Sequence, residues 1–115
     1  SNPTTIGNNV IIQARVTICP GITIEDGVFI GAGTVFTNDK KPPSNNIERT
    51  LVKKGARIGA NVTILPGITI GKETMIGAGS VVTKNIPYKQ TWIGNPAERL
   101  IKYNRIKYLS IPNDC

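Results

Sequence analysis

The sequence predicts an all-β solenoid in which a short strand and a corner repeat every six residues. A large apolar residue returns at every sixth position over two stretches of the 115-residue chain. The first stretch carries Ile6, Ile12, Ile18, Ile24, Ile30 and Phe36, and the second carries Val52, Ile58, Ile64, Ile70, Ile76 and Val82. Six residues are too few for a pair of helices, and one such unit cannot bury its own apolar side chain. Successive units must therefore pack on one another.

Residues that favour turns stand between these apolar positions. They occur as Asn8–Asn9, Pro20–Gly21, Asp26–Gly27, Ala32–Gly33, Ala60–Asn61, Pro66–Gly67 and Ala78–Gly79. Because Gly and Asn accept a positive φ at low cost, we expect a corner in each unit. Three corners close one triangular coil, and stacked coils pair as parallel strands about 4.8 Å apart. The Ile, Val and Phe side chains then point inward on all three sides.

The segments Ile58–Thr63 and Ile76–Val81 resemble the repeat of the hexapeptide acyltransferases, which is aliphatic, small, any two residues, small or β-branched, any residue. This resemblance covers roughly Ile6 to Ile101. It implies a left-handed parallel β-helix, an exception to the right-handed crossover rule, which we place at residues 1–95. Since nothing ahead of Ile6 would cap the first coil, we expect further coils or a partner at that end.

A loop is expected where the repeat is interrupted. Phe36 and Val52 are sixteen residues apart, which is one six-residue unit plus ten extra residues. If Phe36 lies on the third side of its coil, Val52 restarts on the first side and the register is kept. We therefore predict an exposed loop at about 37–51, and loops on a rigid scaffold often carry function.

After Val82 the repeat fades, and a helix is expected to follow. Asn95 is a good N-cap, Pro96 suits the first helical position, and Glu98 suits the third. We predict a short basic helix over 96–108 that covers the open end of the coils, followed by a frayed tail at 109–115.

Composition limits the class of protein. A chain of this length is one domain, and no apolar run is long enough to span a membrane, so we expect a cytoplasmic protein without a membrane partner. Two cysteines argue against a disulfide scaffold. The net charge of +7 suits a polyanionic ligand such as coenzyme A or a sugar nucleotide. No nucleic-acid-binding motif is visible, so nucleic acid is not expected as a partner.

The chain contains no histidine. An alcohol needs a base to remove its proton during attack on a thioester, whereas an amine with a pKa near about 8 is partly neutral and already nucleophilic. The same absence argues against a three-histidine zinc site, and no metal is expected.

The segment Val35–Pro42, with Lys53–Asn61 downstream, resembles N-acetyltransferases that act on amino-sugar nucleotides. The resemblance implies catalytic roles for Asn38, which would orient the amine, and for Asp39, which would hold the sugar or stabilise a developing ammonium. Alternatively, both residues only shape the first turn of the loop. Pro20 stands where that subfamily usually has an acidic residue, which leaves the acceptor open.

The segment Ile76–Lys84 resembles the coenzyme A groove of the wider family. This resemblance implies that coenzyme A binds at Gly59, Ala60, Gly77, Ala78, Thr83 and Lys84. We add Arg99 as a basic residue that would meet a phosphate of the coenzyme. Gly59 and Gly77 equally suit corners, and Trp92 suits either adenine stacking or, as we favour, packing at the end of the coils.

Three interpretations follow. The leading one is an acetyl-CoA-dependent N-acetyltransferase of a nucleotide-linked amino sugar that assembles as a homotrimer. The second is an O-acetyltransferase of a sugar or small acceptor with a base such as Asp39. The third is a non-catalytic β-helix subunit.

Overall fold

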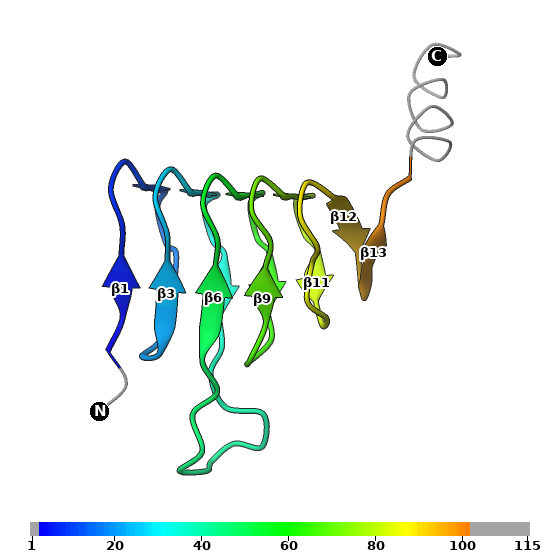
Figure 1. The fold of residues 1–115 in the computed structure, drawn as a ribbon. Helices are drawn as coiled ribbons and strands as arrows, with labels where there is room; N and C mark the ends of the chain where they lie inside the picture. Colours follow the sequence, from blue (N-terminus) through cyan, green and yellow to red (C-terminus); the bar gives the residue numbers. More distant parts are fainter. Residues whose placement is uncertain (1–2, 102–115) are drawn as a thin grey trace.

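The computed structural model describes residues 3–101, which form a left-handed parallel β-helix with triangular coils (Figure 1). One side consists of β1 (Thr5–Ile6), β3 (Ile22–Ile24), β6 (Thr50–Val52) and β9 (Thr69–Ile70). The second consists of β2 (Ile11–Ile12), β4 (Phe29–Ile30), β7 (Arg57–Ile58), β10 (Met75–Ile76), β12 (Thr91–Gly94) and β13 (Ala97–Arg99). The third consists of β5 (Val35–Phe36), β8 (Thr63–Ile64) and β11 (Val81–Val82).

Coils stack in a constant register that places like residues over like. Ile24 pairs with Val52 and Val52 with Ile70 on the first side, while Ile30 pairs with Ile58 on the second. The repeated apolar residues from Ile24 to Val82 are almost completely buried, and they form one continuous core. The expected inward ladders are therefore confirmed. The repeated residues of the first coil are less covered, since Ile6 is 47% and Ile12 is 38% exposed.

Non-glycine residues take the positive φ at several corners. Asn9, Arg15, Asn61, Glu73 and Lys89 have φ values between 55° and 62°. Asparagine was expected at such positions, but Arg15, Glu73 and Lys89 were not. Their side chains reach outward from the corner, so the stacking of the coils holds a backbone conformation that these residues adopt rarely on their own.

The loop leaves the corner between the third and the first side, as predicted. Phe36 ends β5 on the third side and Val52 ends β6 on the first, so the ten extra residues leave the register intact. Thr50 and Leu51, which we assigned to the loop, belong to β6 instead. Figure 1 shows the loop extending from this edge, away from the body of the prism.

The predicted helix is wrong where the structure tests it, because Ala97–Arg99 form strand β13. This strand pairs antiparallel with β12, Gly94 takes a φ of 109° in the turn, and Leu100 N–H donates to Thr91 O at 2.7 Å. The buried Ala97 packs against the core, as does Trp92, whose predicted packing role is confirmed. Pairing and burial outweigh the local capping signal of Asn95–Glu98. The remainder of the predicted helix and the tail lie outside the described residues.

Among residues 3–101, no helix is long and apolar enough to cross a membrane.

Four hydroxyl side chains are buried within the described coils, and one of them has no hydrogen-bond partner there. Thr34, Thr74 and Ser80 each donate to a backbone carbonyl of a corner glycine, at 3.0, 2.9 and 2.6 Å. Thr50 Oγ1 is equally buried and makes no such bond. A buried hydroxyl without a partner costs free energy, because it has lost its hydrogen bonds to water.

Thr50→Val is therefore expected to raise the free energy of unfolding by about 1 kcal/mol, since valine keeps the shape and removes the unpaired hydroxyl. Thr34→Val is the matched control and should lower it by about 1–2 kcal/mol, because the bonds to Gly59 O and from Val62 N–H are lost. Denaturant unfolding of the three proteins measures both changes. A destabilised Thr50→Val variant would contradict the assignment.

Candidate functional site

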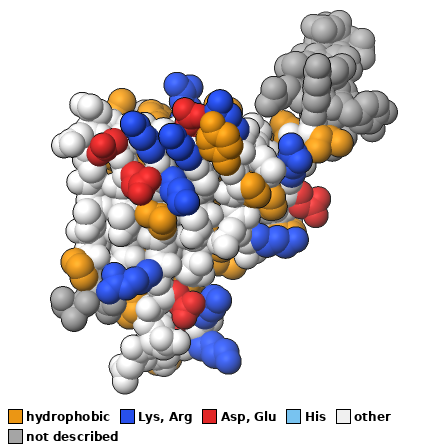
Figure 2. Space-filling view, viewed as in Figure 1, with side chains coloured by type: hydrophobic (Ala, Val, Ile, Leu, Met, Phe, Trp, Pro, Cys, Tyr) orange, Lys and Arg blue, Asp and Glu red, His pale blue; other side chains and the backbone are white. Residues whose placement is uncertain are grey.

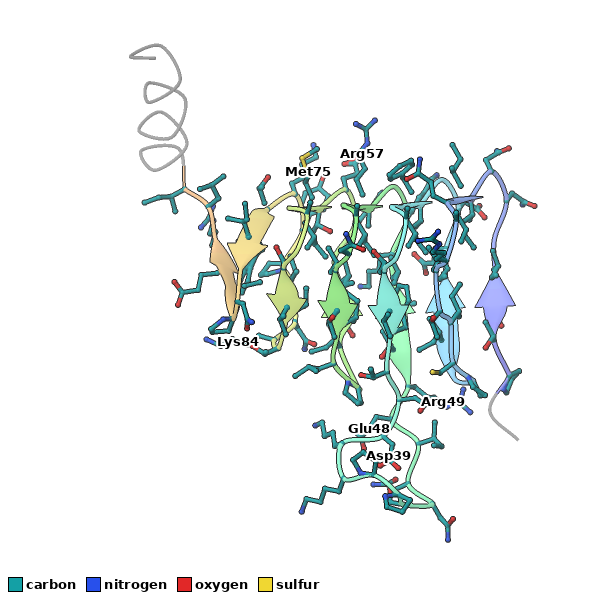
Figure 3. All side chains as sticks on the ribbon, turned by 180° about the vertical axis from the view of Figure 1, so that it is seen from behind. Asp39, Glu48, Arg49, Arg57, Met75 and Lys84 are labelled. Atoms are coloured by element: carbon teal, nitrogen blue, oxygen red, sulfur yellow. The ribbon has the colours of Figure 1, made fainter. Side chains whose placement is uncertain are left out.

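A groove lies beneath the loop, along the corner between the third and first sides. It has a volume of about 820 Å³. The loop contributes Thr37, Asp39, Lys40, Lys41 and Pro42, and the corners of the next two coils contribute Leu65, Pro66, Gly67, Ile68, Thr83, Lys84 and Asn85. We call this hollow the loop groove. Figure 3 shows Asp39 in the loop and Lys84 on the same edge of the prism.

Asp39, predicted to be catalytic, binds its own loop. Its carboxylate accepts hydrogen bonds from Lys41 N–H at 3.1 Å, Ser44 N–H at 2.7 Å and the Ser44 hydroxyl. The Ser44 hydroxyl bond is the largest reason that the pKa of this carboxyl lies below its ordinary value of 3.8. A weakly basic carboxylate with three donors already bound is poorly suited to remove a proton from an alcohol.

Asn38, the other predicted catalytic residue, also has a structural bond. Its side-chain amide donates to Pro20 O at 2.9 Å, and its backbone carbonyl accepts from Glu48 N–H at 2.9 Å. The two bonds tie the start of the loop to the preceding coil and to the end of the loop. The interpretation that Asn38 and Asp39 shape the first turn is thus supported by contacts, while the roles toward an acceptor stay predictions.

The predicted coenzyme residues Gly59, Ala60, Gly77 and Ala78 lie at a different corner, between the second and third sides. The N–H groups of Gly59 and Gly77 are both occupied, since they donate at 2.9 Å to Ile76 O and Trp92 O of the next coil. Within the described residues, the N–H groups of Ala60 and Ala78 make no hydrogen bond. They are the donors left at this corner for a ligand.

The lack of a side chain at the glycines explains these unpaired donors. At the equivalent corner of the first coil, Gln13 Oε1 accepts from Ala32 N–H of the following coil at 3.1 Å. Gly31 and Gly59 occupy the position of Gln13 in the next two coils, so no side chain reaches Ala60 or Ala78. Sequence alone suggested these alanines by resemblance, and the stacking shows why their N–H groups are unpaired.

One subunit does not bring all predicted residues together. The Ala60 and Ala78 corner and the Thr83–Lys84 corner border opposite edges of the same side, β5–β8–β11. Arg99 lies elsewhere, in β13 at the outer end of the second side. The structure therefore joins Asp39, Thr83 and Lys84 in the loop groove and leaves Gly59, Ala60, Gly77, Ala78 and Arg99 outside it.

Two features of the surface were missed from the sequence. Lys40 and Lys41 line the loop groove beside Lys84, and Figure 2 shows basic side chains around the loop as well as along the opposite edge. A second hollow of about 480 Å³ lies on the second side, lined in part by Ile11, Phe29, Arg57 and Met75. Arg57 and Met75 lie away from the loop in Figure 3. Each of the four residues immediately precedes a residue of the six-residue repeat, a signal that could have been read from the sequence.

Metal chemistry gains no support from the described part of the chain, where no three His, Cys, Asp or Glu side chains cluster. The free Cys19 is half-buried and donates its thiol to Phe36 O at 3.1 Å.

Comparison with known proteins places these features in context. Residues 3–38 and 49–84, more than half of the chain, match the family model described as bacterial transferase hexapeptide (six repeats). Over 42 residues the chain is 55% identical to galactoside O-acetyltransferase of Escherichia coli (strain K12), a match that covers 36% of this chain and 21% of that protein.

Two solved structures are similar over most of the chain. A hexapeptide-repeat containing acetyltransferase of Vibrio cholerae O1 biovar eltor, complexed with acetyl coenzyme A, has a TM-score of 0.78 at 30% identity and covers 85% of this chain and 59% of that one. A maltose O-acetyltransferase from Clostridium difficile 630 has a TM-score of 0.79 at 29% identity and covers 84% and 57%. The chain thus spans about a fifth of the curated relative and less than two thirds of the solved ones.

Proposed function

This chain belongs to the bacterial transferase hexapeptide family, and on that premise we propose that it transfers an acetyl group from acetyl-CoA to a hydroxyl of a sugar or small acceptor. The observation that carries the proposal is the pair of unpaired N–H groups of Ala60 and Ala78, stacked at one corner. Two such donors could bind the amides of the pantetheine arm or the carbonyl oxygen of the thioester. The similarity to a structure complexed with acetyl coenzyme A supports the same cosubstrate.

The reaction is an acyl transfer. The acceptor oxygen forms a bond to the thioester carbonyl carbon, the carbon–sulfur bond breaks, and the acceptor proton passes to a base or to the departing thiolate. Backbone donors stabilise the negative charge on the carbonyl oxygen as the bond forms. Binding the two substrates in one orientation supplies a further part of the rate enhancement.

The second candidate is acetylation of the amino group of a nucleotide-linked amino sugar. It is favoured by the absence of histidine from the 115 residues and by the lowered pKa of Asp39, which together leave no evident base for a hydroxyl. A neutral amine attacks a thioester without prior deprotonation, so positioning would suffice. The galactoside and maltose O-acetyltransferases among the similar proteins favour the first candidate instead.

Assembly as a homotrimer in the cytoplasm is part of the proposal. The loop groove and the Ala60 and Ala78 corner border opposite edges of one side in a single subunit. A ring of three parallel prisms could place one edge of each subunit beside the other edge of its neighbour, so that both sets of residues face the same ligand. Sedimentation equilibrium at micromolar concentration tests this arrangement, and a monomer at all concentrations would contradict it.

Acetyl transfer is tested by following thiol release from acetyl-CoA with a panel of acceptors. Galactoside and maltose serve as hydroxyl acceptors, and 3-amino and 4-amino sugar nucleotides serve as amine acceptors, each with its matched hydroxyl or amino analogue. We expect thiol release with a hydroxyl acceptor to exceed the background hydrolysis of acetyl-CoA without acceptor by at least about tenfold. Turnover confined to amines would establish the second candidate, and no turnover with either class would contradict both.

A further inference from the structure

We propose that the hollow on the second side binds the acyl chain of the donor, so that the enzyme also uses acyl-CoA donors with chains longer than acetyl. We call this cavity of about 480 Å³ the second-side hollow. The inference rests on the proposed function, because it concerns the acyl group of the same donor. Figure 3 shows two of the lining residues, Arg57 and Met75, on the edge of the prism away from the loop.

A row of outward side chains on the second side forms the hollow. The constant register places them next to one another in successive coils, in the order Ile11, Phe29, Arg57 and Met75. Ile11 is 58% exposed and Met75 is 45% exposed. At a strand spacing of about 4.8 Å, four such residues span about 14 Å along the prism. A contiguous apolar surface that remains open to water is typical of a site for a ligand or a partner.

Arg57 continues the apolar surface of the row. It is the one charged residue among the described residues that line the hollow, and it forms no ion pair with any residue from 3 to 101. An exposed arginine lays its methylene groups along apolar neighbours and keeps its guanidinium in water. The stem of Arg57 therefore joins the surfaces of Phe29 and Met75, and the hollow suits an uncharged hydrocarbon chain.

The hollow borders the two unpaired N–H groups that carry the proposed function. Gly59 and Gly77 line it, and they immediately precede Ala60 and Ala78 in the chain. Because glycine has no side chain, these two positions place no wall between the hollow and the corner. A thioester carbonyl that accepts from the Ala60 or Ala78 N–H therefore has an apolar surface beside it. The acyl chain, which is bonded to the same carbonyl carbon, can extend onto that surface.

The size of the hollow and the burial it offers set the expected gain in affinity. A volume of about 480 Å³ lies within the range typical of small-molecule sites. Full burial of one methylene group is worth about a fourfold gain in affinity. Since the side chains of the row are themselves half exposed, we expect about twofold for each methylene group. The transfer step is the one described above, and only the length of the acyl group differs.

Isothermal titration calorimetry without acceptor tests the hollow, with acetyl-CoA, butyryl-CoA and hexanoyl-CoA as probes. We expect hexanoyl-CoA to bind about tenfold to twentyfold more tightly than acetyl-CoA. Met75→Gln and Phe29→Gln should each reduce this ratio to below about fourfold, whereas Met75→Leu should keep it. Ile101→Gln is the matched control, because Ile101 is as exposed as Met75 and lies outside the hollow. Each variant supplies its own reference, since a misfolded protein would lose both donors.

Three results would overturn the inference. The first is a ratio near one in the unmodified protein, and the second is a high ratio that neither Met75→Gln nor Phe29→Gln reduces. In the second case, a smaller particle for Met75→Gln in sedimentation would assign the row to a contact between copies of the chain instead. The third concerns the reaction: saturating hexanoyl-CoA should support thiol release with the acceptor panel, and a rate below about a hundredth of the acetyl rate would show unproductive binding.

Failure of the hollow is distinct from failure of the transferase. Acetyl transfer together with a hexanoyl ratio near one leaves the proposed function intact and refutes the chain site. A chain-length dependence that Met75→Gln abolishes, without transfer from any of the three donors to any acceptor, establishes the chain site as a binding site and refutes the transferase. A protein that binds none of the three donors refutes both.

Discussion

Replacing Gly59 with alanine is expected to lower the free energy of unfolding by about 2–3 kcal/mol, the upper range for overpacking a tight interior. A Cβ at this position would lie 2.7 Å from Ala78 N and 2.9 Å from Ile76 O. Both contacts are with backbone atoms of the next coil, which cannot rotate away. Ile76 O also accepts the Gly59 N–H at 2.9 Å, so the added methyl group would push apart the coils at one of their own hydrogen bonds.

Gly77→Ala is the matched control for this change. Its Cβ would meet the Ile93 side chain at 2.7 and 2.8 Å, but Ile93 is 45% exposed and can change rotamer. We therefore expect a loss below about 1 kcal/mol. Thermal unfolding followed by circular dichroism compares the two variants. Equal melting temperatures of the two variants would show that the backbone atoms of the next coil do not constrain Gly59.

Asp39→Ala should release the loop, with at least about a tenfold faster protease cleavage within residues 40–46, because locally opened segments are those that proteases cut. Alanine removes the acceptor of all three bonds that fold the segment from Asp39 to Ser44. The melting temperature should hardly change, since the loop lies outside the core. Limited proteolysis with mass spectrometry locates the cut, and Asp26→Ala, which removes an exposed carboxylate at a distant corner, is the control.

Acid should have the same effect on the loop as the substitution. The folded-state pKa of Asp39 lies below its ordinary value of 3.8, so the unfolded segment binds the proton more tightly than the folded one. The contribution of Asp39 to loop order is therefore complete above pH 3.8 and lost as pH falls through the lower folded pKa. Hydrogen exchange at Ser44 N–H across this range measures the change. A loop equally protected in Asp39→Ala and in the unmodified protein would contradict the role assigned to these bonds.

The predicted features that depend on local pattern are confirmed. The six-residue spacing predicted that Ile24, Ile58 and Val82 point inward. Each side of a coil is one six-residue unit, so a buried position recurs at every sixth residue. The loop could be located for the same reason: ten extra residues between Phe36 and Val52 leave the phase of the repeat unchanged. The corner residues followed from the preference of Gly and Asn for positive φ, although Arg15 and Glu73 adopt it as well.

The helix predicted from Pro96 failed because its signal was purely local. The Asn95–Glu98 segment has the residues of a helix start, yet Ala97 is 1% exposed and its strand pairs with β12. A strand that both pairs and packs buries more than an isolated turn of helix, which is marginal alone. The four residues Asn95–Glu98 carry no local sequence signal for pairing with β12.

The sequence by itself determined the periodic part of this protein: the solenoid, its inward ladders and the edge from which the loop departs. Only the tertiary structure decided which polar groups remain available. Asp39 and Asn38 proved to be bound within the loop and to Pro20, while the N–H groups of Ala60 and Ala78 are unpaired because glycines lie in the preceding coil. Lys41 and Lys84 are 43 positions apart in the chain and line one groove. The physical reason is that hydrogen bonding and charge at a corner depend on the neighbouring coils, which short-range patterns do not describe.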